Sequence, residues 1–536
     1  MQVTPDFTAF ARNWTAGKNQ TVFTTLVSDT ETPVSAMLKL GADKPYAFLL
    51  ESMEGGATRG RYSIIGREPD LIWRTERGGK VTINRNALRQ LDSFTPVAEK
   101  PLDSIRTLLL ECAIDDLNQP QPMAAGIFGY LGYDMVRYME RLPDEKPVGV
   151  DVPEAILIRP TLLAVFDLIE NKFTLVTPAW FDKTQSAETA YVAALERLKH
   201  ALEDLNKRTD EIAVGKRDAA PPPLAGGVGG GLGNTSTNLA SPPLPPPQAG
   251  GVQVAPLSPS LTANMTETDY VGMVKRAKDY ISAGDIFQVV LSQRFSRPFA
   301  APPFELYRTI RRLDPSPFLF YFNFNGFAVV GSSPEILVRV REGKVTIRPI
   351  AGTRARGLGN RSDAELAAEL LADPKELAEH LMLLDLGRND VGRVAKIGSV
   401  KVTARNTIEY YKHVMHIVSN VEGELDPAFS PLDALIGGFP AGTVSGAPKV
   451  RAMEVIAELE PDRRGVYAGC MGYFGANGSM DTCIAIRTAV IKDGMIHVQA
   501  GAGIVYDSDP QSEYRECVAK ARGMLRAAEE TLSPTT

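Results

Sequence analysis

Two segments of the sequence combine a signal for the start of a helix with a pair of glutamates three residues apart. They are DPKELAE at residues 373–379 and DPQSEYRE at residues 509–516. Aspartate suits the N-cap, because its side chain accepts hydrogen bonds from free backbone N–H groups, and proline suits the first helical position, where no N–H is needed. Residues three apart share one face of a helix, so Glu376 and Glu379 project together, as do Glu513 and Glu516.

The chemistry that these glutamates could perform is metal binding. If the two helices face each other, four carboxylates meet, and their mutual repulsion requires a cation or bound protons. Carboxylates that leave room for substrate oxygens favour Mg²⁺, so the sequence predicts a Mg²⁺ site. Two solvated acidic helix faces, with Glu376 closing a capping box on Asp373, are the alternative that the spacing alone leaves open.

The composition narrows the class of protein. The chain has 536 residues, of which 44% are hydrophobic, enough for a large core and more than one domain. A formal net charge of −6 without a long basic run argues against a nucleic-acid partner. Four cysteines without CxxC spacing, no targeting signal at the N-terminus and no apolar run of membrane-spanning length predict a cytoplasmic protein that does not enter a membrane.

A stretch rich in proline and glycine divides the chain. Residues 208–262 carry scarcely a large apolar side chain, so we expect a disordered insertion or linker there. Residues 1–207 contain strand-like runs, and residues 263–531 mix strands with strong helices. Alternating apolar residues and hairpin turns such as EGK, ANG and DGM predict an α+β fold that is largely antiparallel.

Other candidate residues lie between the two glutamate segments in the sequence. Gly501-Ala502-Gly503 ends a long strand just before the second helix, and glycines let backbone N–H groups approach an anion. Arg487 has apolar neighbours on both sides, so its guanidinium needs a carboxylate, either structural or a ligand's. His416 in an apolar strand and Thr443 in a turn rich in glycine are further candidates; a core histidine and a turn residue are the simpler interpretations of their local sequence.

Several segments together resemble the chorismate-utilising enzymes, and among them the anthranilate synthase component I family. Those in the second block are IAGTRARG, AEHLMLLDLGRNDVGRV, VMHIVSNVEGEL, FPAGTVSGAPKVRAMEVI, GVYAGCMGYF, DTCIAIRTA and QAGAGIVYDSDPQSEYRE. LLESMEGGATRGRYSIIG and GYLGYDMVRYMERLP extend the resemblance into the first block. The insertion lies outside it.

The resemblance implies a fold and a reaction. The fold would be a large antiparallel β-sandwich with helices packed outside and two intertwined subdomains, the first block binding tryptophan and the second binding chorismate. The reaction would convert chorismate and ammonia to anthranilate and pyruvate with Mg²⁺, through 2-amino-2-deoxyisochorismate, as the first step of tryptophan biosynthesis. No glutaminase triad region is visible, so ammonia would come from a separate glutaminase subunit, component II, in a heterotetramer, or from a high concentration of free ammonium.

Carried over position by position, the resemblance assigns roles to individual residues. Glu379 and Glu516 would bind the metal, with Glu376 and Glu513 in support. The positions that would bind chorismate are Gly352, Thr353, Tyr467, Arg487, Gly501, Ala502 and Gly503. His416 would assist pyruvate elimination as a proton shuttle or orienting group, Thr443 would lie near the ring, and Glu335 would be the general acid at the departing hydroxyl.

Two positions favour ammonia as the nucleophile. Isochorismate and salicylate synthases place a water-activating lysine where this chain has Gln288, and glutamine is no base. Aminodeoxychorismate synthases place a nucleophilic lysine where this chain has Ala351. Aminodeoxychorismate synthase component I remains the alternative enzyme, and a non-catalytic subunit that responds to tryptophan remains an alternative of another class.

The resemblance also implies feedback inhibition by L-tryptophan. Ser52 in the LLES run and Pro317-Phe318-Leu319 match the positions that bind the inhibitor. A role in the core at a strand end is the alternative for Ser52. Inhibition requires that the two ligands favour different conformations of the enzyme.

Overall fold

The computed structural model describes residues 2–54, 58–115, 120–121, 123–143, 146–207, 261–357, 361–411 and 414–533. The predicted insertion at 208–262 lies outside the described residues except for its last two positions. The proposed division into residues 1–207, 208–262 and 263–531 therefore stays a prediction. Within the described ranges, no helix is both long enough and apolar enough to cross a membrane.

The chain before residue 208 forms a block rich in strands. Its helices are α1 (Phe7–Thr15), α2 (Pro33–Leu40), α3 (Pro101–Glu111), the 3₁₀ helix η1 (Tyr133–Tyr138) and α4 (Ala187–Leu205). Its strands are β1 (Gln20–Val27), β2 (Phe48–Glu54), β3 (Thr58–Glu76), β4 (Lys80–Asn84), β5 (Thr95–Val97), β6 (Gly126–Leu131), β7 (Ala155–Asp167) and β8 (Lys172–Ala179).

Of the residues that the structure describes, those after residue 260 contain most of the helices. They are α6 (Glu267–Ser282), α7 (Pro303–Leu313), α8 (Asp363–Ala372), α9 (Pro374–Gly392), α10 (Pro431–Gly438), the 3₁₀ helix η2 (Gly442–Val444), α11 (Lys449–Leu459) and α12 (Pro510–Leu532). The strands are β9 (Thr262–Ala263), β10 (Gln288–Pro298), β11 (Phe318–Asn323), β12 (Phe327–Ser333), β13 (Ile336–Arg341), β14 (Lys344–Ile347), β15 (Ile350–Ala355), β16 (Lys401–Tyr410), β17 (Val414–Glu424), β18 (Gly446–Ala447), β19 (Cys470–Gly475), β20 (Met480–Ile484), β21 (Thr488–Lys492) and β22 (Met495–Ile504).

Strands from both blocks share one hydrogen-bonded network. In the part of the chain that the structure describes, the network joins 22 strands, and every pairing between them is antiparallel. β2 of the first block pairs with β11 of the second, and β6 pairs with β19. The predicted α+β class with a large antiparallel sheet is confirmed.

Aromatic stacking shows that this sheet folds over onto itself. Phe48 on β2 and Phe128 on β6 have ring centroids 4.8 Å apart, although the hydrogen-bonded path from β2 to β6 runs through β3 and β7. Phe322 on β11 stacks on the other side of Phe48 at 5.1 Å. These rings belong to a second buried cluster, separate from the larger core that packs the other face of the sheet under the helices. Such interior aromatic pairs add favourable contact energy to the burial of their area.

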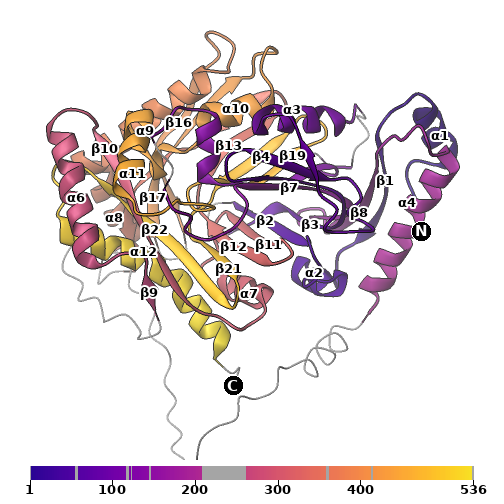
Figure 1. Cartoon of the computed structure of the whole chain (residues 1–536), viewed down its shortest axis with the longest axis horizontal. Helices are drawn as coiled ribbons and strands as arrows, with labels where there is room; N and C mark the ends of the chain where they lie inside the picture. Colours follow the sequence, from indigo (N-terminus) through magenta and orange to yellow (C-terminus); the bar gives the residue numbers. More distant parts are fainter. Residues whose placement is uncertain are drawn as a thin grey trace, which may run out of the picture.

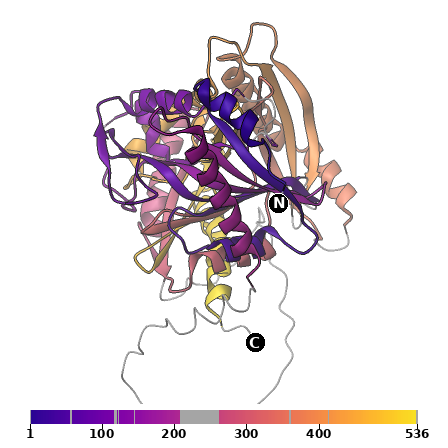
Figure 2. The ribbon, with the colours of Figure 1, turned by 90° about the vertical axis from the view of Figure 1, so that its right-hand side faces the viewer.

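Several of the helices lie at the two ends of the molecule. Figure 1 shows α6, α9, α11 and α12 at one end and α1 and α4 at the other. Figure 2 looks onto the second end, where α4 packs on β8 and β1. At the first end, α9 packs on β15 and β17, whereas α12 packs on β22. Two distant parts of the sheet thus present one long helix each to the same region.

Candidate active site

The two glutamate helices begin where the sequence predicts. α9 starts at Pro374, and its N-cap Asp373 accepts from the backbone N–H groups of Lys375 and Glu376. α12 starts at Pro510, and Asp509 accepts from the backbone N–H of Ser512. The predicted N-caps are confirmed, and each cap fixes the direction in which the first turn projects its carboxylates.

The carboxylates of the two helices influence each other electrostatically. Burial raises the pKa of Glu379, and the negative charges of Glu376 and Glu516 raise it further. Burial also raises the pKa of Glu513, with Glu516 adding to the effect. The pKa of Glu516 is lowered instead, mainly by the positive charge of Lys520. Glu379 on α9 and Glu516 on α12 are therefore close enough for their charges to interact.

Lys520 is a member of this site that the sequence did not reveal. Its Nζ lies 2.8 Å from Glu516 Oε1 and donates to the Gly501 carbonyl at 3.1 Å. It thereby joins α12 to the glycine-rich end of β22. The signal was available, because residues four apart share a helix face and Lys520 follows Glu516 by four.

The carboxylates suit a metal ion that brings ligands of its own. Within the described ranges, no group of three His, Cys, Asp or Glu side chains is close enough to form a ready-made metal cage. Mg²⁺ does not need one, because it retains waters and binds through one or two carboxylates plus substrate oxygens. Glu379 and Glu516 fit that requirement, since like charges raise the pKa of Glu379 and a cation between them would relieve the repulsion.

The other two glutamates are held by neighbouring groups. Glu376 Oε1 accepts from Arg354 Nη1 at 3.0 Å, and Arg354 also bonds Asp373 at 2.7 Å. A hydrogen bond from Ser508 lowers the pKa of Glu513 against the effect of burial. These contacts are consistent with supporting positions for Glu376 and Glu513.

The glycine-rich strand lies against Tyr467. A β-carbon at Gly501 would lie 2.8 Å from the Leu291 carbonyl oxygen and 2.9 Å from the Tyr467 hydroxyl, so only glycine allows this approach. Ala502 is fully buried and pairs with Leu291. Gln288, the position predicted to exclude water activation, places its amide nitrogen 2.5 Å from where a β-carbon of Gly503 would lie.

His416 connects the strands to α9 through Gly352. His416 Nδ1 lies 3.2 Å from the Gly352 carbonyl and 3.0 Å from Thr353 Oγ1. Gly352 adopts a φ of +68°, and a β-carbon there would lie 3.2 Å from Glu376 Oε2. Burial, together with the positive charge of Arg487, lowers the pKa of His416 to about 4. The ring is neutral at physiological pH, and in the tautomer that donates from Nδ1 to the Gly352 carbonyl, Nε2 is free to accept a proton.

Glu335 and Thr443 meet beside Arg487. Thr443 Oγ1 donates to Glu335 Oε1 at 3.2 Å. Burial raises the pKa of Glu335 to about 8, although the Thr443 hydrogen bond, a backbone hydrogen bond at Ile350 and the charge of Arg487 all lower it. Glu335 is therefore a carboxylic acid that is mostly protonated at neutral pH and can donate a proton.

The charge of Arg487 acts on both Glu335 and His416, and among the described residues its ion pair is a long one. Its Nη1 lies 3.9 Å from Asp314 Oδ2 and 3.5 Å from Ser316 Oγ. Its backbone has a φ of 48°, in the left-handed region that side chains other than glycine, asparagine and aspartate rarely adopt. A side chain held in this way with only long contacts is available to a ligand carboxylate.

The candidate tryptophan positions lie at the β2–β11 pairing. Ser52 is directly opposite Phe318, so their side chains share one face of the sheet. Ser52 Oγ donates to the Tyr62 carbonyl at 3.1 Å. Leu319 lies opposite Glu51, points to the other face and is 1% exposed. Strand register thus places Ser52 and Phe318 together, with Pro317 immediately before β11.

Comparison with known proteins shows which family has this arrangement. Residues 68–526 match the family model described as chorismate binding enzyme. Anthranilate synthase component 1 of Cereibacter sphaeroides is 51% identical over 524 residues, covering 98% of this chain and 97% of that protein. This chain belongs to the anthranilate synthase component 1 family of chorismate-binding enzymes.

Two further members support the assignment to the anthranilate synthase component 1 family. The component 1 protein of Pseudomonas aeruginosa is 44% identical, with 94% of each chain covered. The crystal structure of anthranilate synthase component I from Streptococcus pneumoniae has a TM-score of 0.71 at 34% identity, covering 93% of this chain and 98% of that one. The resemblance read from the sequence motifs is confirmed.

Proposed function

We propose that this protein converts chorismate and ammonia to anthranilate and pyruvate, the first committed reaction of tryptophan biosynthesis. The observation that supports this most strongly is the cluster itself. Glu516 of α12 contacts Lys520, which donates to the Gly501 carbonyl on β22, and the charge of Arg487 acts on both a neutral His416 and a protonated Glu335. A dicarboxylate that loses a hydroxyl and an enolpyruvyl group requires this combination of cations, an acid and a base.

Two groups of residues would hold the substrate carboxylates. Arg487 would clamp one carboxylate with its planar guanidinium, and the backbone N–H groups of Gly501 to Gly503, with Tyr467 beside them, would receive the other. Glu379 and Glu516 would hold Mg²⁺, which when bound supplies positive charge to a substrate carboxylate. Gly352 and Thr353 would keep His416 oriented, since both contact its Nδ1.

The surroundings of Glu335 and His416 give the two side chains opposite roles, Glu335 as the acid and His416 as the base. Glu335 would protonate the departing ring hydroxyl as ammonia adds at C2, since burial keeps it protonated. His416 would then accept the C2 proton on Nε2 as the bond between C3 and the ether oxygen breaks. The departing enolpyruvate takes up one proton at its methylene carbon to become pyruvate, which balances the proton lost from C2. Thr443 would hold Glu335 in place through its hydrogen bond.

The pH dependence of the rate tests the role assigned to Glu335. Because Glu335 acts in its protonated form, kcat/KM at a fixed concentration of unprotonated ammonia falls as pH rises through about 8. Thr443→Val removes a hydrogen bond that lowers this pKa, so the alkaline limb moves to higher pH while the maximal rate falls. A limb that stays in place in the variant would rule out Glu335 as the acid.

A direct assay separates this function from its alternative. Purified protein is incubated with chorismate, Mg²⁺ and an ammonium salt, and anthranilate is followed by its blue fluorescence. We expect anthranilate, because Gln288 and Ala351 supply neither the water-activating base nor the nucleophile of related enzymes. An amino-chorismate product without fluorescence would instead establish an aminodeoxychorismate synthase.

The same proposal covers regulation, partners and location. L-tryptophan would bind near Ser52 and Phe318, and its addition to the assay would lower the rate. The relatives are named component 1, which supports a separate glutaminase component as the source of ammonia, in a heterotetramer. We place the activity in the cytoplasm, where the four buried thiols would stay reduced.

A further inference from the structure

Arg464 lies in the segment between α11 and β19 and bonds three separate elements. Its side chain is 1% exposed. Nε and Nη2 donate to the two oxygens of Glu460 at 2.9 and 2.6 Å. Nη1 donates to the Val444 carbonyl at 2.7 Å, and Nη2 donates to the Val290 carbonyl, also at 2.7 Å.

Each of these acceptors adjoins a residue of the candidate site. Val444 follows Thr443, which bonds Glu335. Val290 lies opposite Gly503 in the β10–β22 pairing. Glu460 Oε1 also accepts from the Ser292 backbone N–H at 2.7 Å, and Ser292 lies opposite Gly501. Arg464 and Glu460 therefore fix the turn before α11 relative to the glycine-rich strand.

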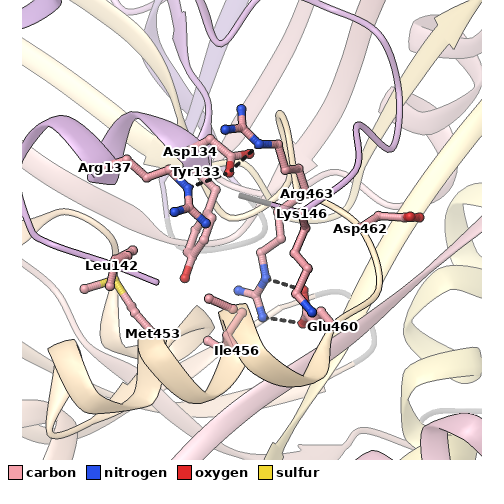
Figure 3. A pocket seen from close by; sticks show the side chains of 12 residues that line it. Tyr133, Asp134, Arg137, Leu142, Lys146, Met453, Ile456, Glu460, Asp462 and Arg463 are labelled. Carbon is pink, nitrogen blue, oxygen red and sulfur yellow. Dashed lines mark hydrogen bonds and ion pairs between the residues drawn. The ribbon is translucent and has the colours of Figure 1, made fainter. Parts of the chain in front are cut away.

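Two aromatic rings complete the surroundings of Arg464. The centre of its guanidinium lies 5.5 Å from the centroid of Tyr467, the residue packed against Gly501, and 4.8 Å from that of Tyr133 in the first block. Both distances are typical of cation–π contacts. Figure 3 shows Tyr133 and Glu460 on opposite sides of a pocket that Arg464 also lines. The cation thus lies between a ring of the first block and a ring of the site.

We propose that Arg464 is a positioning residue for chorismate binding. Its side chain holds Tyr467, the Thr443 turn and the glycine-rich strand in fixed positions relative to one another. This proposal rests on the proposed function. A buried ion pair is weak evidence of a stabilising role, because packed apolar residues often replace such pairs without loss of stability. The guanidinium here satisfies two backbone carbonyls in addition to Glu460, and both belong to site elements. The planar guanidinium of Arg464 donates to all of these acceptors simultaneously, and the single ammonium group of a lysine cannot do so.

The test compares Arg464→Lys with a matched control, Arg159→Lys. Arg159 is also mostly buried, makes a bidentate pair with Asp70 at 2.8 Å and lies over the Trp180 ring, but contacts no candidate site residue. Both variants lose one buried bidentate contact between a guanidinium and a carboxylate, so we expect both to have a lower melting temperature than the wild type. We expect only Arg464→Lys to raise KM for chorismate and lower kcat, with kcat/KM reduced about 100-fold, as for other small misplacements of site residues. We also expect that chorismate and Mg²⁺ raise the melting temperature of the wild type but not that of Arg464→Lys.

The outcomes separate the two proposals. If the wild type makes no anthranilate, the proposed function fails, and chorismate-dependent melting still reports on Arg464. If Arg464→Lys matches Arg159→Lys in both readouts, the positioning role is overturned. Should Arg464→Lys not fold, Glu460→Gln decides: we expect a smaller loss of kcat/KM in the same direction, and kinetics equal to those of the wild type would refute the role.

Discussion

Replacing Glu516 by glutamine is expected to lower kcat/KM for anthranilate synthesis about a thousandfold, because charge stabilisation by a bound metal is worth several kcal/mol. Glutamine preserves the shape of the side chain but removes the charge that attracts a cation. It also leaves Lys520 without its carboxylate partner at 2.8 Å. Steady-state rates measured across a range of Mg²⁺ concentrations show the loss, and excess Mg²⁺ would restore part of the activity if the metal site is weakened rather than abolished.

The matched control for Glu516→Gln lies on the same helix. Glu529, near the other end of α12, is about half exposed and forms an ion pair with Arg297, whose side chain is mostly buried. Glu529→Gln removes an equal charge from α12, and we expect wild-type kinetics because surface ion pairs contribute little. Equal losses in both variants would show that the effect belongs to the helix and not to a metal site.

Replacing Arg487 by asparagine is expected to lower kcat/KM for chorismate about 100-fold, mainly through KM, since losing one member of a buried charge pair costs ~2–5 kcal/mol. Asparagine tolerates the φ of 48° at this position, so the backbone need not change. Arg487→Lys retains the charge without the fork and should give an intermediate KM. An unchanged KM in both variants would exclude Arg487 as the carboxylate clamp.

The Arg487→Asn variant also has a defined effect on pH dependence. The positive charge of Arg487 lowers the pKa of His416 and of Glu335, so its removal raises both values. Glu335 then stays protonated to higher pH, and the alkaline limb of the rate moves upward. His416 gains its proton at a higher pH than before, so the acidic limb moves upward as well. Both limbs should return towards their wild-type positions in Arg487→Lys.

Local features of the fold were predictable because they depend on neighbours in the sequence. The N-caps Asp373 and Asp509 follow from Asp-Pro pairs. Hairpin turns and alternating apolar residues predicted that the sheet is largely antiparallel. The pairing of β2 with β11 was not predictable in this way, since it joins residues separated by more than 250 positions and no local pattern specifies the partner.

Part of the site escaped prediction for the same reason. The glutamates, Arg487 and the glycine-rich strand carry recognisable motifs. Arg464 looks like an ordinary charged residue in the sequence, and only the fold brings it beneath Tyr467. The pKa of Glu335 near 8 depends on burial by distant strands, which no local pattern reveals.

Metal binding measured without turnover tests the central claim most directly. Mn²⁺ substitutes for Mg²⁺, and its electron paramagnetic resonance signal reports the free ion. With chorismate present, we predict that the wild type binds one Mn²⁺ per chain and that both Glu379→Gln and Glu516→Gln lose this binding, whereas Glu529→Gln retains it. Undiminished Mn²⁺ binding in the first two variants would contradict a metal held between α9 and α12.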